Sequence, residues 1–213
     1  MASCRKGKKH GKANFASQFS EDKRHRAGYC SVSDFEGIGS ALGAEEKAMP
    51  LSKTKTILVA YFSRTGNTRE VANQIHKSVG GEIFEIKAVE PYPEDYEAVK
   101  ERGKQELVSG YKPALKTKIE NIKSYDLVFI GYPIWWGTFA APVKTFLSEN
   151  DFSEKTIIPF CTHAGSGLGR SVTDISKLCP KSITLEGIAV WGGDAKNAQD
   201  DVSEWLRKIR ITK

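Results

Sequence analysis

A cluster of short polar side chains directly follows the apolar run of residues 56–62. The cluster, residues 63–68, reads SRTGNT and holds three hydroxyl side chains, one amide and one glycine. Such groups donate hydrogen bonds to anionic oxygens, and the unpaired N–H groups at the start of a helix attract negative charge. A helix cap needs only one such residue, and here there are four among six. The pattern therefore favours a phosphate site over an ordinary capped turn.

Two familiar phosphate motifs are absent from this cluster. It lacks the G-x-x-x-x-G-K-S/T pattern of the Walker A loop and the G-x-G-x-x-G pattern of dinucleotide-binding turns. Arg64, inside the cluster, either adds positive charge or points to solvent.

Two later loops carry residues suited to a flat ligand. Residues 131–142 read GYPIWWGTFAAP, and the adjacent Trp135 and Trp136 suit stacking on a planar ring. The plainer alternative is that one tryptophan is core and the other packs on a helix. Residues 161–169 read CTHAGSGLG, whose small side chains permit close approach of a ring while Thr162 and backbone N–H groups bond its polar edge.

Neither a catalytic side chain nor a metal site is expected. Cys161 ends an apolar run, where a lone cysteine is usually core, and a lone loop histidine such as His163 usually faces solvent. The four cysteines show neither a C-x-x-C pair nor metal-ligand spacing with the four histidines. We therefore expect reduced thiols and no zinc site or disulfide framework.

The elements that must position these loops alternate along the chain. Five apolar runs rich in β-forming residues are expected to be strands, the last of them uninterrupted. They comprise residues 56–62, 82–87, 126–132, 156–161 and 183–191.

Segments with a period of about 3.6 residues separate the runs and predict helices. The first places Val71, Ile75 and Val79 on one face and ends at Gly80. The others lie around residues 94–109, 140–148, 168–178 and 202–209. Together the patterns predict an α/β fold, a doubly wound five-stranded parallel sheet with helices on both faces. In such folds ligands bind beyond the carboxyl ends of the strands, where the three loops lie.

Size and charge limit the function classes. The chain has 213 residues, 39% of them hydrophobic, which predicts one substantial core. The longest apolar run, residues 57–62, is far below the roughly 20 residues that span a bilayer, so we expect a cytoplasmic protein with no membrane partner. The net charge of +6 divides evenly, +3 before Met49 and +3 after it, which argues against a nucleic-acid partner.

Residues 1–48 differ from the rest. They hold the basic clusters RKGKK and DKRHR and show no sustained helix or strand period. We expect a disordered basic extension, because such a segment buries too little apolar surface to offset its ordering entropy. A solvated leader is favoured over a nucleic-acid or targeting tail. Met49 is the only other methionine and a candidate natural start, in which case the extension is not native.

The three loops, in this order, resemble the flavodoxin family, particularly its short-chain FMN-binding members. SRTGNT matches the family pattern S/T-x-T-G-x-T, PIWWGT resembles the second flavin loop, and THAGSG the third. The resemblance implies a flavodoxin-like FMN-binding domain over residues 53–213, with FMN as cofactor. The implied cofactor-binding residues are Ser63, Thr65, Gly66, Asn67 and Thr68 for the phosphate, and Pro133, Ile134, Trp135, Trp136, Gly137, Thr138, Thr162, His163, Ala164, Gly165, Ser166 and Gly167 for the ring.

The function that the resemblance implies is electron transfer, with Gly137 letting the adjacent peptide reorient toward the flavin. The first alternative is an FMN-dependent NAD(P)H oxidoreductase acting on quinones or similar acceptors, and the second a non-redox FMN-binding sensor or interaction module. The expected partners are accordingly redox proteins, or NAD(P)H and a quinone-like acceptor. The second and third loops contain no carboxylate, so we expect a less strongly reducing protein than an acidic low-potential carrier.

Overall fold

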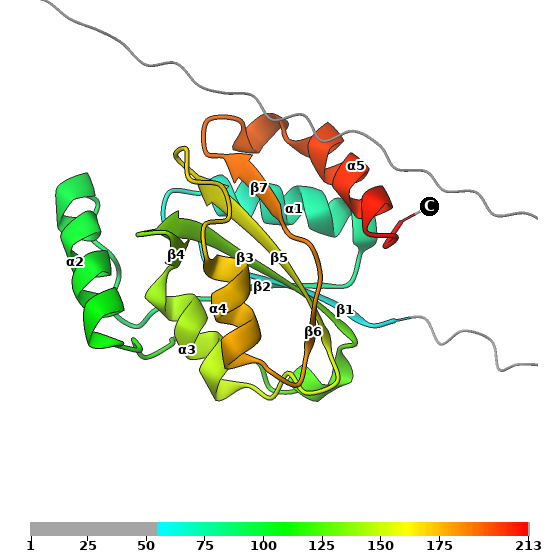
Figure 1. Cartoon of the computed structure of the whole chain (residues 1–213), viewed down its shortest axis with the longest axis horizontal. Helices are drawn as coiled ribbons and strands as arrows, with labels where there is room; N and C mark the ends of the chain where they lie inside the picture. The colour runs from blue at the N-terminus through cyan, green and yellow to red at the C-terminus, as the bar shows by residue number, and fades with distance from the viewer. Residues whose placement is uncertain (1–54, 213) are drawn as a thin grey trace, which may run out of the picture. The chain divides into compact units, whose positions relative to one another are not determined.

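The computed structural model describes residues 55–212, and Figure 1 shows the arrangement of its elements. The predicted basic extension, residues 1–48, and the candidate start Met49 lie outside the described residues. The described chain forms a parallel sheet whose strand order is β2-β1-β3-β5-β6. Two further strands join it, since β4 pairs with β3 and β7 with β5. The strands are β1 (Ile57–Tyr61), β2 (Glu82–Glu85), β3 (Leu127–Trp135), β4 (Thr138–Phe139), β5 (Thr156–His163), β6 (Ile183–Thr184) and β7 (Ile188–Trp191).

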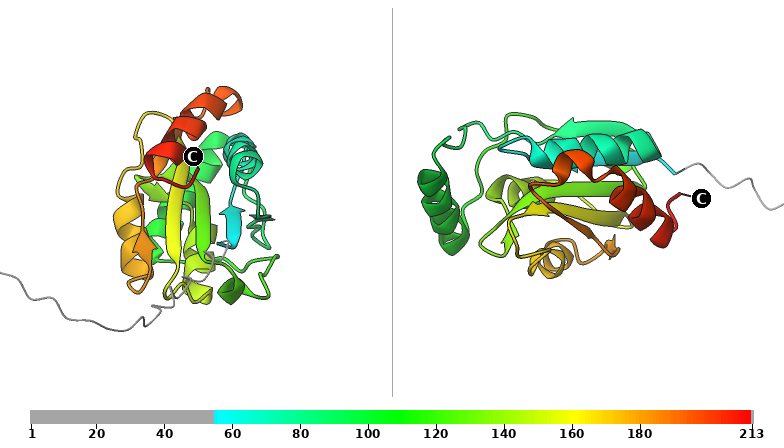
Figure 2. Two further views of the ribbon diagram at one scale, coloured as in Figure 1. Left: turned by 90° about the vertical axis from the view of Figure 1, so that its right-hand side faces the viewer. Right: turned by 90° about the horizontal axis from the view of Figure 1, so that it is seen from above.

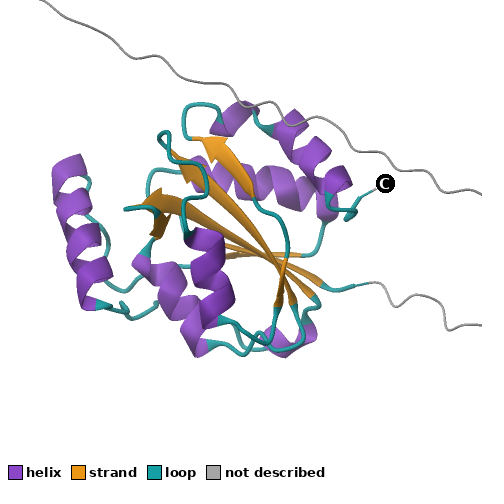
Figure 3. Ribbon diagram, in the orientation of Figure 1, coloured by secondary structure: helices purple, strands orange, loops and turns teal. Residues whose placement is uncertain are grey.

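The helices connect these strands, and Figure 3 distinguishes the two kinds of element by colour. They are α1 (Asn67–Val79), α2 (Tyr96–Ser109), α3 (Ala141–Glu149), α4 (Ser171–Leu178) and α5 (Gln199–Lys208), with 3-10 turns at Ile122–Ser124 and Ala195–Asn197. Within residues 55–212, no helix has the length and apolar character needed to cross a membrane.

Both faces of the sheet are buried, as the apolar strands predict. Alternate residues of β1 point to opposite faces, so Leu58 joins a core cluster with Phe146 of α3. Its neighbour Val59 joins a second cluster with Val71 of α1 and Trp205 of α5. Helices α1 and α5 thus cover one face, while α3 and α4 cover the other (Figure 2). The predicted doubly wound parallel sheet is confirmed.

Helix α2 is the exception, because it covers neither face. It stands beyond the carboxyl ends of the strands in Figure 1 and in the right-hand view of Figure 2. Asp95 caps it by accepting a hydrogen bond from the N–H of Ala98 at 2.8 Å. Gly103 lets the helix approach the end of β3, since a Cβ there would lie 3.3 Å from the Trp135 ring. The helix therefore borders the region where the sheet carries its loops.

The prediction of an uninterrupted last strand, residues 183–191, is wrong. The structure divides it into β6 and β7, and the register against β5 shifts by one residue between them. The carbonyl of Ile157 accepts a hydrogen bond from the N–H of Leu185 at 2.9 Å. The next group of β5 on that side belongs to Pro159, which has no N–H to donate. The ladder is broken there and the neighbouring strand bulges.

The edge strand β2 carries an ion-pair group at its carboxyl end. Glu85 pairs with Arg69 of α1 and with Lys87, the latter at 3.0 Å. Burial alone would raise the pKa of Glu85, but the hydrogen bonds from Arg69 and Lys87 outweigh it and hold the pKa below its ordinary value.

Candidate functional site

A cavity of about 410 Å³ lies where β1, β3 and β5 end. Its size falls within the range of roughly 300–1,000 Å³ that is usual for small-molecule sites. The residues that line it come from all three predicted loops, from α2 and from the end of β7. They are Arg64, Thr65, Asn67, Tyr96, Val99, Lys100, Pro133, Ile134, Trp135, Trp136, Thr162, His163, Ala164 and Gly192.

The loop between β1 and α1 offers unpaired hydrogen-bond donors. Gly66 has a φ of +96° and donates its N–H to the Ser63 hydroxyl at 3.1 Å. No side chain caps α1, and the N–H groups of Asn67 and Thr68 have no acceptor among the described residues. A helix start with free N–H groups attracts anions. The loop therefore presents donors beside the cavity, as its sequence predicts.

A buried hydroxyl pair joins the first loop to the third. The side-chain oxygens of Thr68 and Thr162 lie 2.8 Å apart, and both residues are buried. Thr162 also lines the cavity, whereas Thr68 does not. The Thr68 hydroxyl is thus engaged in fixing the two loops together, and its backbone N–H is the donor left free.

The second predicted loop is a hairpin formed by β3 and β4. Trp135 pairs with Thr138, and the two residues between them, Trp136 and Gly137, have φ values of +51° and +80°. Positive φ at both central positions is characteristic of a type I′ turn, which matches the twist of the flanking strands. The tight turn fixes the direction of the two tryptophans.

The two tryptophans have different neighbours and share the cavity. Trp135 packs edge-on against Tyr92 and Phe62, with ring centroids 4.9 and 5.8 Å apart. Trp136 is 43% exposed and donates its indole N–H to the carbonyl of Lys100 on α2 at 2.9 Å. Both rings line the cavity. Both tryptophans therefore contact neighbouring elements, as the plainer alternative describes, and both also line the cavity, where the stacking prediction places them.

Two predicted residues of the second loop turn away from the cavity. The Thr138 hydroxyl donates to Asp174 of α4 at 2.8 Å, and the carbonyl of Gly137 accepts from the N–H of Arg170 at 2.9 Å. Both residues therefore connect the hairpin to α4 and to the residue that precedes it.

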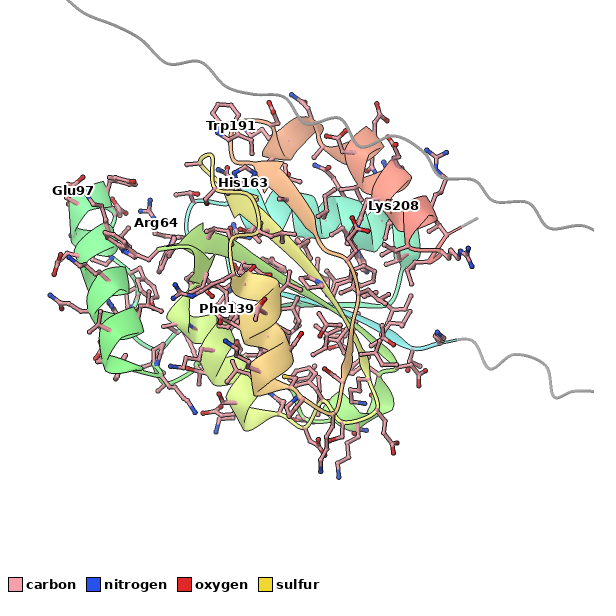
Figure 4. All side chains as sticks on the ribbon, in the orientation of Figure 1. Arg64, Glu97, Phe139, His163, Trp191 and Lys208 are labelled. Carbon is pink, nitrogen blue, oxygen red and sulfur yellow. The ribbon has the colours of Figure 1, made fainter. Side chains whose placement is uncertain are left out.

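The third loop is only partly at the cavity. His163 and Ala164 line it, while Gly165, Ser166 and Gly167 do not. The N–H of Gly165 donates to the Nδ1 of His163 at 2.9 Å, which folds the loop back on itself. In Figure 4, His163 lies near Trp191, its partner across the β5–β7 pairing.

Cys161, at the end of β5, is core as the sequence predicts. It is fully buried, and burial raises the pKa of its thiol to about 12. A neutral buried thiol is unreactive.

Sequence reasoning missed the contribution of α2. Tyr96, Val99 and Lys100 line the cavity, and no motif in their segment signals this. Arg64 explains how the helix reaches the site, because its Nη1 donates to the carbonyls of Pro93 at 3.3 Å and Glu94 at 3.1 Å. Figure 4 shows Arg64 between α2 and the strand ends.

The charge of the cavity is positive. Arg64 and Lys100 are the cations among its lining residues. Lys100 pairs with Glu97 at 2.7 Å, whereas Arg64 forms no ion pair within residues 55–212, and no described carboxylate lines the cavity. Free N–H donors, the unpaired Arg64 guanidinium and two indoles suit a ligand that combines an anionic group with a flat aromatic body.

Solved structures of similar fold include two from Bacteroides. A protein of Bacteroides eggerthii regarded as a flavoprotein is 35% identical, with a TM-score of 0.66 over 74% of this chain and 99% of that one. A Bacteroides uniformis protein regarded in the same way is 30% identical, with a TM-score of 0.66 over 73% and 99%. A Lactobacillus acidophilus flavoprotein in complex with FMN is 24% identical, with a TM-score of 0.58 over 70% and 99%, and shows the fold alone.

Sequence comparison gives the family. A flavodoxin from Haemophilus influenzae is 28% identical over 101 residues, which are 46% of this chain. The alignment spans 44%, less than half, of that relative's length. The model of the flavodoxin family (Flavodoxin_4) matches residues 56–209, most of the described chain. The chain therefore belongs to the flavodoxin family.

Proposed function

We propose that the protein binds FMN noncovalently in the 410 Å³ cavity and acts in electron transfer. The observation that carries the proposal is the convergence of free backbone donors and two indoles on one cavity at the carboxyl edge of a flavodoxin-family sheet. The complex of the Lactobacillus acidophilus relative with FMN supports the choice of ligand.

The chain divides the binding task between its loops. The N–H groups of Asn67 and Thr68 and the Thr65 hydroxyl hold the phosphate, assisted by the positive charge of Arg64. Trp135 and Trp136 provide aromatic surface for the ring. When bound, FMN supplies one- and two-electron redox chemistry, while the protein controls affinity, access and potential.

The lining charges bias the potential upward. Arg64 favours additional negative charge in the cavity, and no lining carboxylate opposes it. Lys100 adds less, because Glu97 pairs with it at 2.7 Å. The midpoint potential should therefore be less negative than that of an acidic low-potential carrier.

The hairpin turn contains one peptide that is free to reorient. The Gly137 carbonyl is held by the N–H of Arg170. The carbonyl of Trp136 accepts no hydrogen bond from residues 55–212. The peptide between Trp136 and Gly137 is thus the group that can turn toward the cavity, which supports an electron-transfer role over a non-redox sensor.

A second candidate function is FMN-dependent oxidation of NAD(P)H with a quinone-like acceptor. The observation that favours it is the guanidinium of Arg64, which lines the cavity, pairs with no carboxylate of residues 55–212 and would also attract an anionic dinucleotide.

One experiment separates the two functions. The full chain is loaded with FMN, titrated anaerobically with a chemical reductant, and then assayed with NAD(P)H and a soluble quinone. Reduction in two resolved one-electron steps without NAD(P)H turnover supports the electron carrier. Rapid turnover without another protein supports the oxidoreductase. Failure of the folded protein to retain FMN contradicts both and leaves an interaction module.

A further inference from the structure

A second cavity, of about 230 Å³, lies between α2, the β3–β4 hairpin, α3 and α4. Trp135 lines this cavity as well as the first, and it is the residue that the two linings share. The second cavity is lined by Gly103, Glu106, Leu107, Tyr111, Trp135, Thr138, Phe139, Ala140, Ala141, Lys144, Asp174, Lys177 and Leu178.

The walls of the second cavity are largely apolar. Trp135, Phe139 and Ala140 form part of its lining, and Leu107 and Leu178 are each 36% exposed beside it. Large apolar side chains that remain exposed around a hollow are typical of a binding surface. A dry cavity of about 150 Å³ is enough to hold benzene. The larger space here has room for an aromatic ring with a polar substituent.

The two carboxylates of the lining are already neutralised. Glu106, only 6% exposed, bonds to the Nε of Arg102 at 2.9 Å and accepts from the Tyr92 hydroxyl at 2.7 Å. Asp174 accepts from the Nε of Arg170 at 3.0 Å in addition to its bond from β4. Neither carboxylate therefore calls for a cationic ligand.

The two lysines of the lining have no such partners. The Nζ of Lys144 donates to the carbonyl of Gly110 at 3.0 Å and pairs with no carboxylate of the described chain. Lys177 forms neither a hydrogen bond nor an ion pair through its side chain within residues 55–212. The cavity thus has apolar walls and two uncompensated ammonium groups, a combination that selects an organic anion over a neutral or cationic ligand.

We propose that the second cavity binds a small aromatic carboxylate, with the ring between Leu107, Phe139 and Leu178 and the carboxylate toward Lys144 and Lys177. The site does not depend on FMN, because it shares only Trp135 with the first cavity. If the proposed function holds, an occupant of the second cavity and FMN contact the same indole.

The test uses the full chain labelled with nitrogen-15 and 1-naphthoate as the probe, with 1-naphthylmethanol as its uncharged counterpart. We expect saturable shifts of the backbone amides of Leu107, Tyr111 and Leu178, with 1-naphthoate bound more tightly than the alcohol. Lys144→Gln and Lys177→Gln should each weaken 1-naphthoate about tenfold, as loss of a charged partner predicts. Lys181→Gln makes the same charge change outside the cavity and should leave the affinity unchanged.

Three results would overturn the proposal. They are an absence of saturable shifts at millimolar probe, shifts confined to first-cavity residues such as Thr65 and Ala164, and equal affinity for the acid and the alcohol. Repeating the titration with FMN separates the two sites. Probe-induced shifts at Thr65 and Ala164 that FMN abolishes would place the probe in the first cavity and overturn the proposal, whereas shifts at Leu107 and Leu178 that persist with FMN bound support it. Failure of FMN to bind would count against the proposed function and leave the aromatic carboxylate site standing.

Discussion

Replacing Gly66 by alanine tests the proposed phosphate site through the backbone alone. Gly66 has a φ of +96°, and a Cβ built there meets no other atom within 4 Å. The substitution therefore introduces no steric clash. It introduces strain, because residues other than glycine in sparsely populated backbone regions cost on the order of 1–3 kcal/mol.

The strain can be relieved only by rotating the loop that precedes α1. Rotation moves the free N–H groups of Asn67 and Thr68, which we propose hold the phosphate. Loss of one hydrogen bond to a charged group costs about 1.5–3 kcal/mol, and about 1.4 kcal/mol corresponds to a tenfold change in affinity. Gly66→Ala should therefore weaken FMN binding about tenfold or more, while binding of riboflavin, which lacks the phosphate, changes little.

Gly80→Ala is the matched control. Gly80 lies at the other end of α1, has a φ of +70°, and a Cβ added there would likewise meet no atom within 4 Å. The variant should lose stability through the same kind of strain, yet it leaves the first loop untouched. We expect its affinity for FMN to equal that of the wild type.

Calorimetric titration with FMN and with riboflavin measures the affinities, and urea unfolding measures the stability of each variant. The phosphate assignment is refuted if Gly66→Ala loses affinity for FMN and riboflavin equally, or if Gly80→Ala loses as much affinity for FMN as Gly66→Ala.

Three further predictions concern the sheet and its edges. Gly131→Ala places a Cβ 2.1 Å from the Phe160 ring, so we expect the free energy of unfolding in urea to fall by about 1–3 kcal/mol. The decrease should be smaller in a Phe160→Leu background, and an equal decrease there would contradict the clash. The pKa of Glu85 is lowered in the fold, so its ionised form adds to the free energy of unfolding above its ordinary pKa, and this contribution is lost as the pH falls through the lower folded value. Glu85→Gln should reduce the loss of stability at acid pH in unfolding experiments, and an unchanged pH profile would count against the ion pairs. Burial raises the pKa of Cys161 to about 12 and that of Cys179 to about 11. Neither thiol should therefore react with iodoacetamide in the native state at a pH of about 8. Rapid labelling of the native protein, detected by mass spectrometry, would disprove their burial.

The architecture was predictable because the signal repeats along each strand. In β1, Leu58 and Val59 are both apolar and point to opposite faces, which only a sheet covered on both sides accommodates. The free donors of the first loop follow from residue types at the junction of one strand and one helix. These features depend on residues that are neighbours in the sequence, so they can be predicted without knowing the tertiary structure.

The remaining features depend on contacts between distant residues. The break in the last strand arises from the missing N–H of Pro159, which lies on the neighbouring strand. The segment that bulges carries one local sign of it, Gly187, where an added Cβ would lie 2.8 Å from the Pro159 carbonyl oxygen. The position of α2 depends on the approach of Gly103 to Trp135 and on the bond from Trp136 to Lys100. Its residues at the cavity could be found only by knowing where the helix stands.

The most direct test of the central claim is a crystal structure of the protein grown with FMN. We expect one FMN in the first cavity, with phosphate oxygens hydrogen-bonded to the N–H groups of Asn67 and Thr68 and the ring beside Trp135 or Trp136. A structure with the phosphate bound elsewhere, or with the cavity free of flavin at saturating FMN, would contradict the claim.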